Sequence, residues 1–498
     1  MESSELWTWF WWANTALMWT IRLIMTVVIV SRRRSPSAAL AWLTLTYAIP
    51  LVGMGAYFLV GENRLGERRR RKHLDTVKHI ESQLTFNAAE IRRHQATIDG
   101  RFCPIANLAE GLGASAPLSG HGMTLLAEPE TLVESLERDI DNAQHHCHLL
   151  YYLFNTDRLG RQIATALGRA VQRGVSCRLL VDAVGSKMLS ESDLWQQLVA
   201  DGVQISSALP VHALRARVAR LDLRNHRKLA VIDGRIAYTG SHNLTGPIYP
   251  RKAHFGSWID ASVRIEGPCV AALQMLFLED WYAERRDLPD RQEIESCVVG
   301  DSHEPPQTGG TWETDSNIIA QVLPTGPLSE ATPLQRVILQ ALHGAENEIV
   351  FTTPYFVPDD ATVVAIQTAA LRGVEVNLVV PRVSDNWIAQ AAGRSFYGEL
   401  LGAGVKVHEF AEGLLHAKTL TVDTDFALIG SANLDIRSFM LNFELAVLIY
   451  DDDFASELRF LQGRYIQQSE SLTLKRWRDR PGRQRIGDPL AKLLSPLL

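Results

Sequence analysis

Two copies of one short pattern carry the residues whose types and spacing could do chemistry. Each copy has a histidine, a lysine two residues later and an aspartate five residues after the lysine, and a Gly-Ser-x-Asn segment follows at the same distance in both. The residues concerned are His226, Lys228, Asp233, Ser241 and Asn243 in the first copy, and His416, Lys418, Asp423, Ser431 and Asn433 in the second. Two such copies at equal spacing are not a chance match, so we expect two equivalent half-sites.

The sequence around the first copy predicts a β-hairpin. β-Branched and apolar residues lead to Asp233-Gly234, a strong turn dipeptide, and a second short strand follows. Side chains two apart in a strand share a face, so His226 and Lys228 point the same way. Asp233 has the opposite parity and lies at the turn. We therefore keep Asp233 and Asp423 in the candidate catalytic set as members of the motif, but interpret them as structural.

Two imidazoles that share one site could act on a phosphodiester in two steps. One neutral imidazole attacks phosphorus and forms a covalent phospho-histidine. The other, protonated, gives a proton to the leaving oxygen and later takes one from the incoming alcohol. The lysines and asparagines of the motifs would hold the non-bridging oxygens, and Ser241 and Ser431 are further candidate contacts to substrate. Two lysines supply the positive charge that a metal would otherwise bring, so we predict neither a metal nor a cofactor.

Two carboxylates are candidates for orienting these histidines. A histidine used in this way needs its second ring nitrogen fixed, and a carboxylate is the usual partner. Asp260 and Glu444 lie shortly after the two Gly-Ser-x-Asn segments. We predict that these two residues hold the two imidazoles.

The long carboxy-terminal part consists of two copies of one α/β unit. In each copy a strand, a helix, a second strand and another helix precede the His-Lys motif, and Arg-Gly-Val stands at matching points, residues 173–175 and 372–374. We predict an α/β fold of two units, 121–286 and 318–498, each with a mixed sheet flanked by helices. Packing about a pseudo-twofold axis would bring the two histidines to one interface. Residues 287–317, with several Pro and Gly, are the predicted linker.

The first 73 residues are different in kind from the rest. Residues 7–30 and 38–60 are almost wholly apolar, and each stretch is long enough to cross a hydrocarbon core of about 30 Å as a helix. We predict two transmembrane helices in a membrane anchor of residues 1–73. Arg22 is unfavourable in the first of them, because a charged side chain within an apolar span is costly. The start Met-Glu-Ser-Ser-Glu lacks the basic region of a secretory signal peptide. Residues 74–120, polar and helical and then irregular, are the predicted juxtamembrane connector.

Basic residues on either side of the second apolar stretch indicate its orientation. Three arginines lie between the stretches, at positions 32–34, and six basic residues follow the second stretch, within positions 64–72. The larger group predicts that the catalytic part is cytoplasmic and the short connector external. The three arginines of the connector leave a second interpretation open, in which the second stretch is a re-entrant hairpin that never fully crosses.

Length and composition exclude some classes of protein. A chain of 498 residues has room for two or three domains. The formal net charge of -6 gives no sign of a protein that coats nucleic acid, so no nucleic-acid partner is predicted. The five cysteines are scattered without a C-x-x-C pair, which argues against a disulfide framework or a zinc site and favours a reducing compartment. The sequence does not indicate an oligomeric state.

The carboxy-terminal tail combines a basic stretch with an apolar one. Six basic residues flank Trp477 or follow it closely, and residues 490–498 are largely apolar. This pattern is typical of contact with a membrane surface, and docking of the tail on its own domain is the alternative.

The duplicated H-x-K-x4-D motif resembles the mark of the phospholipase D superfamily, and the resemblance extends over nearly the whole chain. Within that superfamily the chain is most similar to bacterial cardiolipin synthases, in residues 35–64 and 264–268 and in the final Leu-Leu-Ser-Pro-Leu-Leu. The resemblance implies an enzyme of the bacterial inner membrane that transfers a phosphatidyl group from one phosphatidylglycerol to another and releases glycerol, without a metal. It also implies that His226 is the nucleophile and His416 the acid and base, although the sequence itself leaves the reverse assignment open.

Two other functions remain as alternatives. A hydrolase on the same scaffold, either a phospholipase D or a nuclease, would let water take the phospho-histidine. The apolar stretches and the net charge argue against a nuclease. A membrane-anchored scaffold with an inactive site is the third function considered, but a scaffold has no chemical need for complete motifs in both copies.

Overall fold

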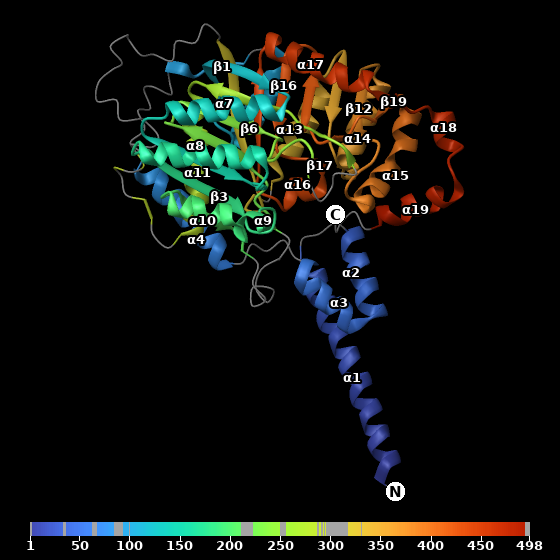
Figure 1. Ribbon diagram of the computed structural model, residues 1–498. Coiled ribbons are helices and arrows are strands. Elements are labelled where there is room, and N and C mark those ends of the chain that lie inside the picture. The colour runs from blue at the N-terminus through green and yellow to red at the C-terminus, as the bar shows by residue number, and fades with distance from the viewer. Residues whose placement is uncertain are drawn as a thin grey trace. The chain divides into compact units, whose positions relative to one another are not determined.

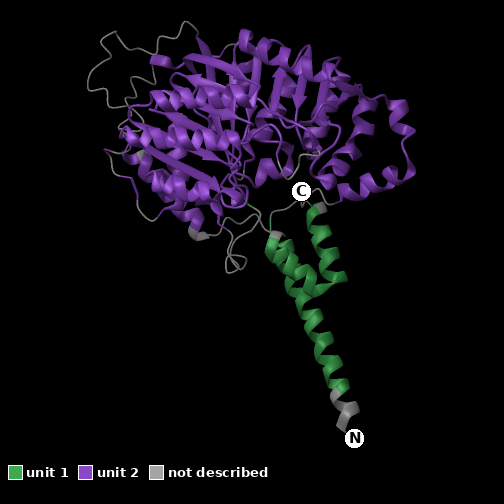
Figure 2. Ribbon diagram, in the orientation of Figure 1, with its two compact units in different colours: residues 1–68, 211–223, 497 green, residues 69–210, 224–496, 498 purple. Residues whose placement is uncertain are grey.

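The computed structural model of the protein describes residues 2–32, 36–61, 67–83, 93–98, 100–210, 223–249, 255–285, 288–289, 292, 294, 317–329 and 331–493. Contacts within the chain divide it into two compact units (Figure 2). The anchor unit is built from residues 1–68 together with 211–223 and 497. The sheet unit is built from residues 69–210, 224–496 and 498.

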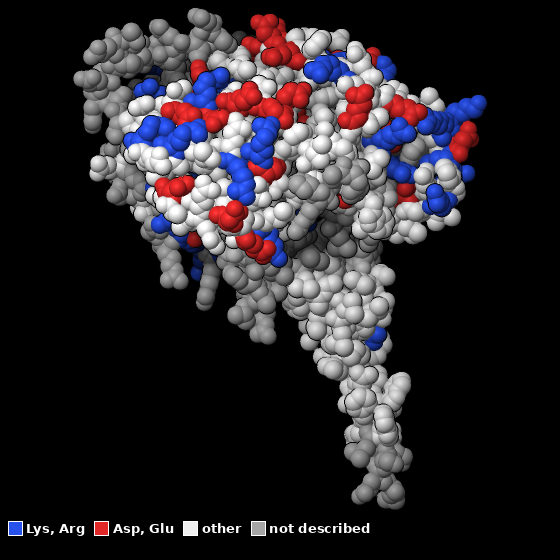
Figure 3. All heavy atoms as spheres, in the orientation of Figure 1, with Lys and Arg blue, Asp and Glu red and all other residues white. Residues whose placement is uncertain are grey.

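The anchor unit consists of helices followed by a short π-helical turn (Figure 1). They are α1 (Glu2–Val30), α2 (Pro36–Ala48), α3 (Pro50–Ala56) and η1 (Tyr57–Gly61). Within α1, residues 7–30 form the one helix of the described chain that is long and apolar enough to cross a membrane. In Figure 3 the visible surface of the anchor is almost free of charged side chains, whereas charges of both signs cover the sheet unit.

The second apolar stretch does not form the single crossing helix that the sequence predicts. Pro50 has no N–H to give to a helix, and its ring disfavours a helical conformation of the residue before it. Ile49 accordingly leaves the helical conformation, with φ of -137° and ψ of 83°. Helix α2 therefore ends at Ala48 and α3 begins at Pro50, so a second transmembrane helix over residues 38–60 is not confirmed.

A fifteen-stranded mixed sheet forms the centre of the sheet unit, in the order β19-β13-β12-β10-β15-β16-β18-β9-β1-β8-β6-β5-β2-β3-β4. The two halves meet where β1 and β9 pair antiparallel, and the strand order on one side of this junction repeats the order on the other. The predicted α/β class and mixed strand directions are present, but the two expected sheets are halves of one continuous sheet. The strands of the first half are β1 (Leu118–Leu126), β2 (His146–Tyr151), β3 (Ser176–Asp182), β4 (Gln204–Ala208), β5 (Lys228–Ile232), β6 (Ile236–Gly240) and β8 (Ser262–Glu266). Those of the second half are β9 (Ile318–Thr325), β10 (Glu348–Thr352), β12 (Glu375–Pro381), β13 (Lys406–Phe410), β15 (Thr419–Val422), β16 (Phe426–Gly430), β18 (Glu444–Tyr450) and β19 (Ser469–Ser471).

Helices cover both faces of this sheet, because alternate strand residues are apolar on both sides. On one face, α11 and α17 share a core with strands of both halves. On the other face, α7, α8 and α10 pack on the first half, and α13, α14 and α15 on the second. These helices are α7 (Pro129–Asn142), α8 (Arg158–Gln172), α10 (Asp193–Ala200), α11 (Cys269–Glu284), α13 (Pro333–Gly344), α14 (Asp360–Leu371), α15 (Trp387–Ala403) and α17 (Asp452–Gln467). The equivalent positions of α11 and α17, and of α7 and α13, reflect the internal repeat seen in the sequence.

The described part of the predicted connector, residues 74–120, is more than a spacer. It includes most of α4 and all of α6, which are α4 (Glu67–Gln83) and α6 (Cys103–Gly111). Ile80 of α4 is fully buried in the core that strands of both halves share. Ile105 and Ala109 of α6 are fully buried in the core that covers the second half. The connector therefore belongs in large part to the sheet unit.

The predicted linker, residues 287–317, lies almost entirely outside the described residues, as do the last five residues of the tail. The described part of the tail forms α18 (Leu474–Arg478) and α19 (Gly482–Lys492). Trp477 of α18 packs on Tyr397 of α15 with ring centroids 5.3 Å apart. Ala491 of α19 is buried against Ala389 and Ala392 of α15. Docking on the protein's own domain thus holds for one face of α19, while Leu490 on another face is exposed.

Asp233 and Asp423 occupy corresponding turns after β5 and β15 and act on the backbone. Both have left-handed backbone conformations, with φ of 50° and 53°. The carboxylate of Asp233 accepts the N–H groups of residues 144–146 at 2.8 Å each. That of Asp423 accepts the N–H groups of residues 346–348 at 2.7 to 3.1 Å. Each aspartate ties its turn to the start of β2 or β10, so we withdraw both from the candidate catalytic set.

We expect Asp233→Ala to lower the free energy of unfolding by about 2 kcal/mol, because three backbone N–H groups lose their acceptor and alanine is strained at this φ. Asp233→Asn keeps one acceptor oxygen and tolerates the left-handed conformation, so its loss is about 1 kcal/mol. Denaturant titration of the full chain in detergent measures both. A variant with full stability but no turnover would return Asp233 to the chemistry.

Candidate active site

Backbone contacts that cross between the two halves of the sheet unit bring the two histidines together. The His226 N–H donates to the Phe443 carbonyl at 2.9 Å, and the His416 N–H donates to the Ile259 carbonyl at 2.7 Å. Two short strands that pair in parallel continue this contact. They are β7 (Trp258–Ile259) and β14 (Leu414–Leu415). Each histidine is therefore held by the backbone of the opposite half.

The two predicted carboxylates also cross, so each holds the histidine of the other half. Glu444, at the start of β18, accepts from the His226 Nδ1 with both oxygens, at 2.9 and 3.1 Å. Asp260 accepts from the His416 Nδ1 at 2.6 Å. Both carboxylates are buried. With Nδ1 engaged, Nε2 is the atom that each ring can offer to a substrate.

Ser241 and Ser431 lie behind these carboxylates and are fully buried, so the expectation that they contact substrate is corrected. The Ser241 Oγ donates to Asp260 at 2.6 Å, and the Ser431 Oγ donates to Glu444 at 2.6 Å. The preceding glycine allows this approach, because a Cβ on Gly240 would lie 2.4 Å from a backbone atom of the neighbouring strand. The serines therefore position the carboxylates that position the histidines.

Lys228 and Lys418 are buried beside the histidines. In each motif the lysine Nζ donates to the carbonyl of the histidine two residues earlier, at 2.6 Å. Burial lowers the pKa of Lys228 to about 7 and that of Lys418 to about 8, although the nearby carboxylates act in the opposite direction. Their charge acts through a poorly polarisable interior, so an anion near the histidines would feel it strongly.

Asn243 and Asn433 line the cavity in front of the histidines but present different atoms. The Asn243 Oδ1 accepts the Leu153 N–H at 3.2 Å, which leaves its amide nitrogen available as a donor. The Asn433 Nδ2 instead donates to Asp435 at 3.1 Å. Asn243 thus fits the predicted contact to a non-bridging oxygen, while part of the Asn433 amide is already engaged.

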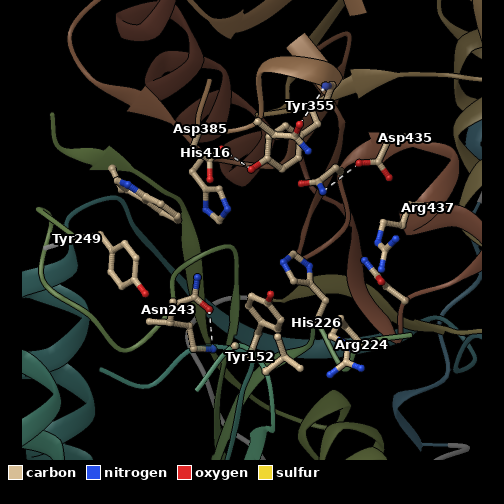
Figure 4. A pocket seen from close by; sticks show the side chains of 18 of the residues that line it. Tyr152, Arg224, His226, Asn243, Tyr249, Tyr355, Asp385, His416, Asp435 and Arg437 are labelled. Carbon is tan, nitrogen blue, oxygen red and sulfur yellow. Dashed lines mark hydrogen bonds between the residues drawn. The ribbon is translucent and has the colours of Figure 1, made fainter. Parts of the chain in front are cut away.

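Both histidines open into one cavity of about 410 Å³, lined by residues of both halves (Figure 4). Figure 4 shows His226 and His416 directed into the same space from different elements. Sequence reasoning did not identify most of the other lining side chains. These include Tyr152, Tyr249, Trp258, Tyr355, Asp385, Arg437 and Asn442.

Aromatic rings pack directly on the two imidazoles. Tyr152 meets His226 edge to face with centroids 4.9 Å apart, and Trp258 lies 4.7 Å from His416. Tyr152 directly follows β2, at the carboxyl end of a parallel strand pair, where sites in α/β folds commonly form. That position is a signal that sequence reasoning could have used. Trp258 could have been found from its place two residues before Asp260.

A second group of lining residues comes from the second half. The Tyr355 hydroxyl donates to Asp385 at 2.5 Å, and both side chains face the cavity (Figure 4). Tyr355 comes shortly after β10, and Tyr152 directly after β2. Asp385 lies in a loop after β12 and Arg437 in a short helix, positions that a single sequence does not mark as functional.

Burial dominates the protonation of the two histidines. It lowers the pKa of His226 and of His416 to about 4, and the partner carboxylates raise these pKa values only in part. Burial also opposes ionisation of Asp260, but His416 and the neighbouring cations outweigh it and lower the pKa of this carboxyl group. At neutral pH both imidazoles are therefore uncharged. A phosphodiester anion would raise the pKa of both rings, since opposite charge favours the protonated form.

Comparison with known proteins agrees with this geometry. The family profile described as "Cardiolipin synthase, PLD-like domain" matches residues 136–281 and 338–461, and one described as "Phospholipase_D-nuclease N-terminal" matches residues 21–62. Cardiolipin synthase A of Proteus mirabilis (strain HI4320) is 35% identical, with 98% of each chain covered. Cardiolipin synthase A of Serratia proteamaculans (strain 568) is 35% identical, with 96% of this chain and 97% of the relative covered.

A solved structure shares the fold. The crystal structure of phosphatidylserine synthase from Haemophilus influenzae Rd KW20 matches with a TM-score of 0.56 over 78% of this chain and 96% of that chain, at 17% identity. Fold and site define this protein as a phosphatidyltransferase of the phospholipase D superfamily. Within that superfamily, the chain belongs to the cardiolipin synthase family with phospholipase D-like domains. Its apolar helix α1 fits a membrane-associated enzyme.

We expect Glu444→Gln and Asp260→Asn each to lower kcat by roughly 10²- to 10⁴-fold, because an amide no longer fixes the imidazole tautomer or stabilises an imidazolium. Steady-state turnover of a phospholipid substrate in mixed micelles measures this. The matched control is Asp359→Asn, which alters a carboxylate that caps α14 and touches neither histidine. Similar losses in all three variants would indicate general damage to the fold.

The lowered pKa values of the histidines also predict how stability depends on pH. The unfolded chain takes up protons near pH 6.5, whereas folded His226 and His416 do so near pH 4. The free energy of unfolding therefore falls as pH decreases from about 6.5 to 4, by roughly 3 kcal/mol for each histidine. His416→Gln should make this fall shallower, and His343→Gln, at an exposed position, should not. Equal pH profiles for all three proteins would contradict the burial effect.

Proposed function

We propose that this enzyme makes cardiolipin by transferring a phosphatidyl group from one phosphatidylglycerol to another through a phospho-histidine, with release of glycerol. The observation that carries this proposal is that two histidines, each fixed by a carboxylate of the opposite half, open into one cavity. The names of the relatives, cardiolipin synthase A, support the choice of product.

The first half-reaction breaks the bond between phosphorus and the headgroup glycerol. The neutral His226 Nε2 attacks phosphorus, and the glycerol oxygen leaves with a proton from His416. In the second half-reaction, a headgroup hydroxyl of another phosphatidylglycerol gives its proton back to His416 and attacks the phospho-histidine. Cardiolipin forms and His226 is regenerated, so atoms and protons balance over the cycle.

Two features of the structure support His226 as the nucleophile and His416 as the acid and base. The His226 side chain is 13% exposed and that of His416 is 6% exposed, so His226 is the more open to the cavity. The contact between His416 and Asp260 is the shorter of the two, at 2.6 Å, which favours a protonated imidazole. Lys228, Lys418 and the amide of Asn243 would stabilise the charge that grows on the non-bridging oxygens.

The location and partners of the enzyme are part of this proposal. We assign it to the bacterial inner membrane with the sheet unit in the cytoplasm, phosphatidylglycerol as its substrate and neither a metal nor a cofactor in the reaction. The proposal also keeps residues 1–73 as the anchor, and 121–286 and 318–498 as the two repeats.

The two histidines can be separated with a phosphatidyl ester of p-nitrophenol, whose leaving group needs no proton. His416→Ala should release a burst of p-nitrophenol and accumulate an acid-labile lipid adduct on the protein, because attack by His226 remains. His226→Ala should give neither burst nor adduct. With phosphatidylglycerol, each variant should lose at least about 10³-fold in turnover, since the two residues act as one unit.

The controls decide between the proposal and its alternatives. His343→Gln, at an exposed position, should turn over as the unaltered enzyme does. Cardiolipin and glycerol in equal amounts, insensitive to EDTA, support the transfer reaction, whereas phosphatidic acid as main product would make the enzyme a hydrolase. Adduct in His226→Ala and not in His416→Ala would reverse the two roles. Turnover that survives both substitutions would defeat the two-histidine scheme.

A further inference from the structure

The second apolar stretch of the anchor folds back on itself at Pro50. Gly53 of α3 lies against Thr46 of α2, so close that a Cβ on Gly53 would be 2.5 Å from the Thr46 Cα. One helical layer further from the turn, the rings of Trp42 and Tyr57 meet at 5.3 Å. These pairs lie at equal distances on either side of residues 49 and 50, as the two arms of an antiparallel hairpin require.

Neither arm of this hairpin is long enough to cross a bilayer. Helix α2 has 13 residues, and α3 with η1 has 12. At about 1.5 Å per residue the arms span roughly 20 and 18 Å, against a hydrocarbon core of about 30 Å. Residues 7–30 of α1, by contrast, are long enough.

The hairpin packs against the carboxy-terminal half of α1. The buried residues Ile21, Met25 and Ile29 of α1 form one cluster with Trp42 and Tyr57. The amino-terminal half of α1 has no such cover, and its tryptophans are largely exposed: Trp7, Trp9, Trp11 and Trp12. Exposed tryptophans at one end of an apolar helix suit the interface of a membrane.

The tip of the hairpin lies beside Arg22 of α1. Its guanidinium donates to the Tyr47 carbonyl at 3.1 and 3.3 Å and lies 5.1 Å from the Trp19 ring centre. The Tyr47 carbonyl is near the end of α2, where the break at Pro50 removes the N–H groups that would continue the helix. A charged residue within an apolar span is tolerated when it pairs with such backbone groups. The Arg22 guanidinium therefore provides hydrogen-bond donors to the Tyr47 carbonyl near the break, and this carbonyl provides an acceptor for the charged side chain.

We propose that α1 alone crosses the membrane, and that α2 and α3 form a re-entrant hairpin that enters from, and returns to, the side of the sheet unit. The amino terminus then lies on the opposite side from the sheet unit. This inference does not depend on the proposed reaction.

The distribution of charge fits one crossing better than two. With two crossings, the arginines at 32–34 and the basic residues within 64–72 lie on opposite sides of the membrane, against the tendency of such residues to stay in the cytoplasm. With one crossing and a re-entrant hairpin, both groups lie on the cytoplasmic side. The amino-terminal segment that crosses outward carries Glu2 and Glu5 and no lysine or arginine before Arg22.

Labelling of single cysteines in the full chain tests this arrangement. The five native cysteines are replaced by serine or alanine, activity is checked, and a cysteine is introduced at Ser4, at Ser35 or at Asn63. A membrane-impermeant maleimide is applied to spheroplasts and to inverted membrane vesicles. We expect Ser4→Cys to react in spheroplasts, and Ser35→Cys and Asn63→Cys to react in inverted vesicles only.

Two other labelling patterns would each overturn the proposal in a distinct way. Reaction of Ser35→Cys from outside, with Ser4→Cys and Asn63→Cys from inside, would show two crossings. Reaction of all three from the inside would show that α1 does not cross. Asn63→Cys serves as the reference for the side of the sheet unit, and the labelling itself does not depend on catalytic turnover.

Two glycine substitutions test the hairpin itself. Gly53→Ala places a Cβ against the Thr46 backbone, so the arms must separate, whereas Gly55→Ala meets no atom within 4 Å. We expect Gly53→Ala to lower the midpoint of thermal inactivation in detergent by several degrees and Gly55→Ala to leave it unchanged. Equal midpoints for the two variants, with labelling as in the parent chain, would show that α2 and α3 do not pack as a hairpin.

Discussion

The site depends on a reciprocal contact between the two halves, in which the carboxylate of one half fixes the imidazole of the other. Glu444 holds His226 and Asp260 holds His416, and a buried serine fixes each carboxylate in turn. Neither half contains a complete catalytic pair by itself, because each histidine and the carboxylate that sets its tautomer come from different halves. The continuous sheet joined at β1 and β9 keeps the halves in the register that these contacts require.

Burial gives this arrangement its chemical character. Two lysines, two imidazoles and two carboxylates lie together where water is largely excluded, so the pKa values of the lysines and histidines fall. Burying these groups together costs free energy, since each of them loses its hydration. A bound phosphodiester anion would favour the charged lysines and the protonated imidazoles. The cluster therefore suits an anion on which negative charge grows during the reaction.

The sequence predicted the parts of the site that repeat. The His-Lys pairs and the α/β repeat follow from spacing and periodicity, which a single chain displays, and the two carboxylates from their place shortly after the Gly-Ser-x-Asn segments. It did not reveal that the carboxylates cross, because pairing between distant strands leaves no local pattern. It missed Asp385 and Arg437, which reach the cavity from a loop and a short helix, and it assigned the buried Ser241 and Ser431 to substrate. In the anchor, hydrophobicity alone suggested a second crossing, and the effect of Pro50 on the helix was overlooked.

The junction of β1 with β9 is the contact that two identical chains, each with one half, would make on forming a symmetric dimer. Joining both copies in one polypeptide removes the demand that they stay identical. The chain shows this freedom: Arg227, bound to Asp280, stands where the second motif has Ala417, and His242, bound to Ser262, stands where it has Ala432. A single cavity can thereby acquire unlike walls, one shaped for a donor and one for an acceptor, which an exact dimer of one gene product could not achieve.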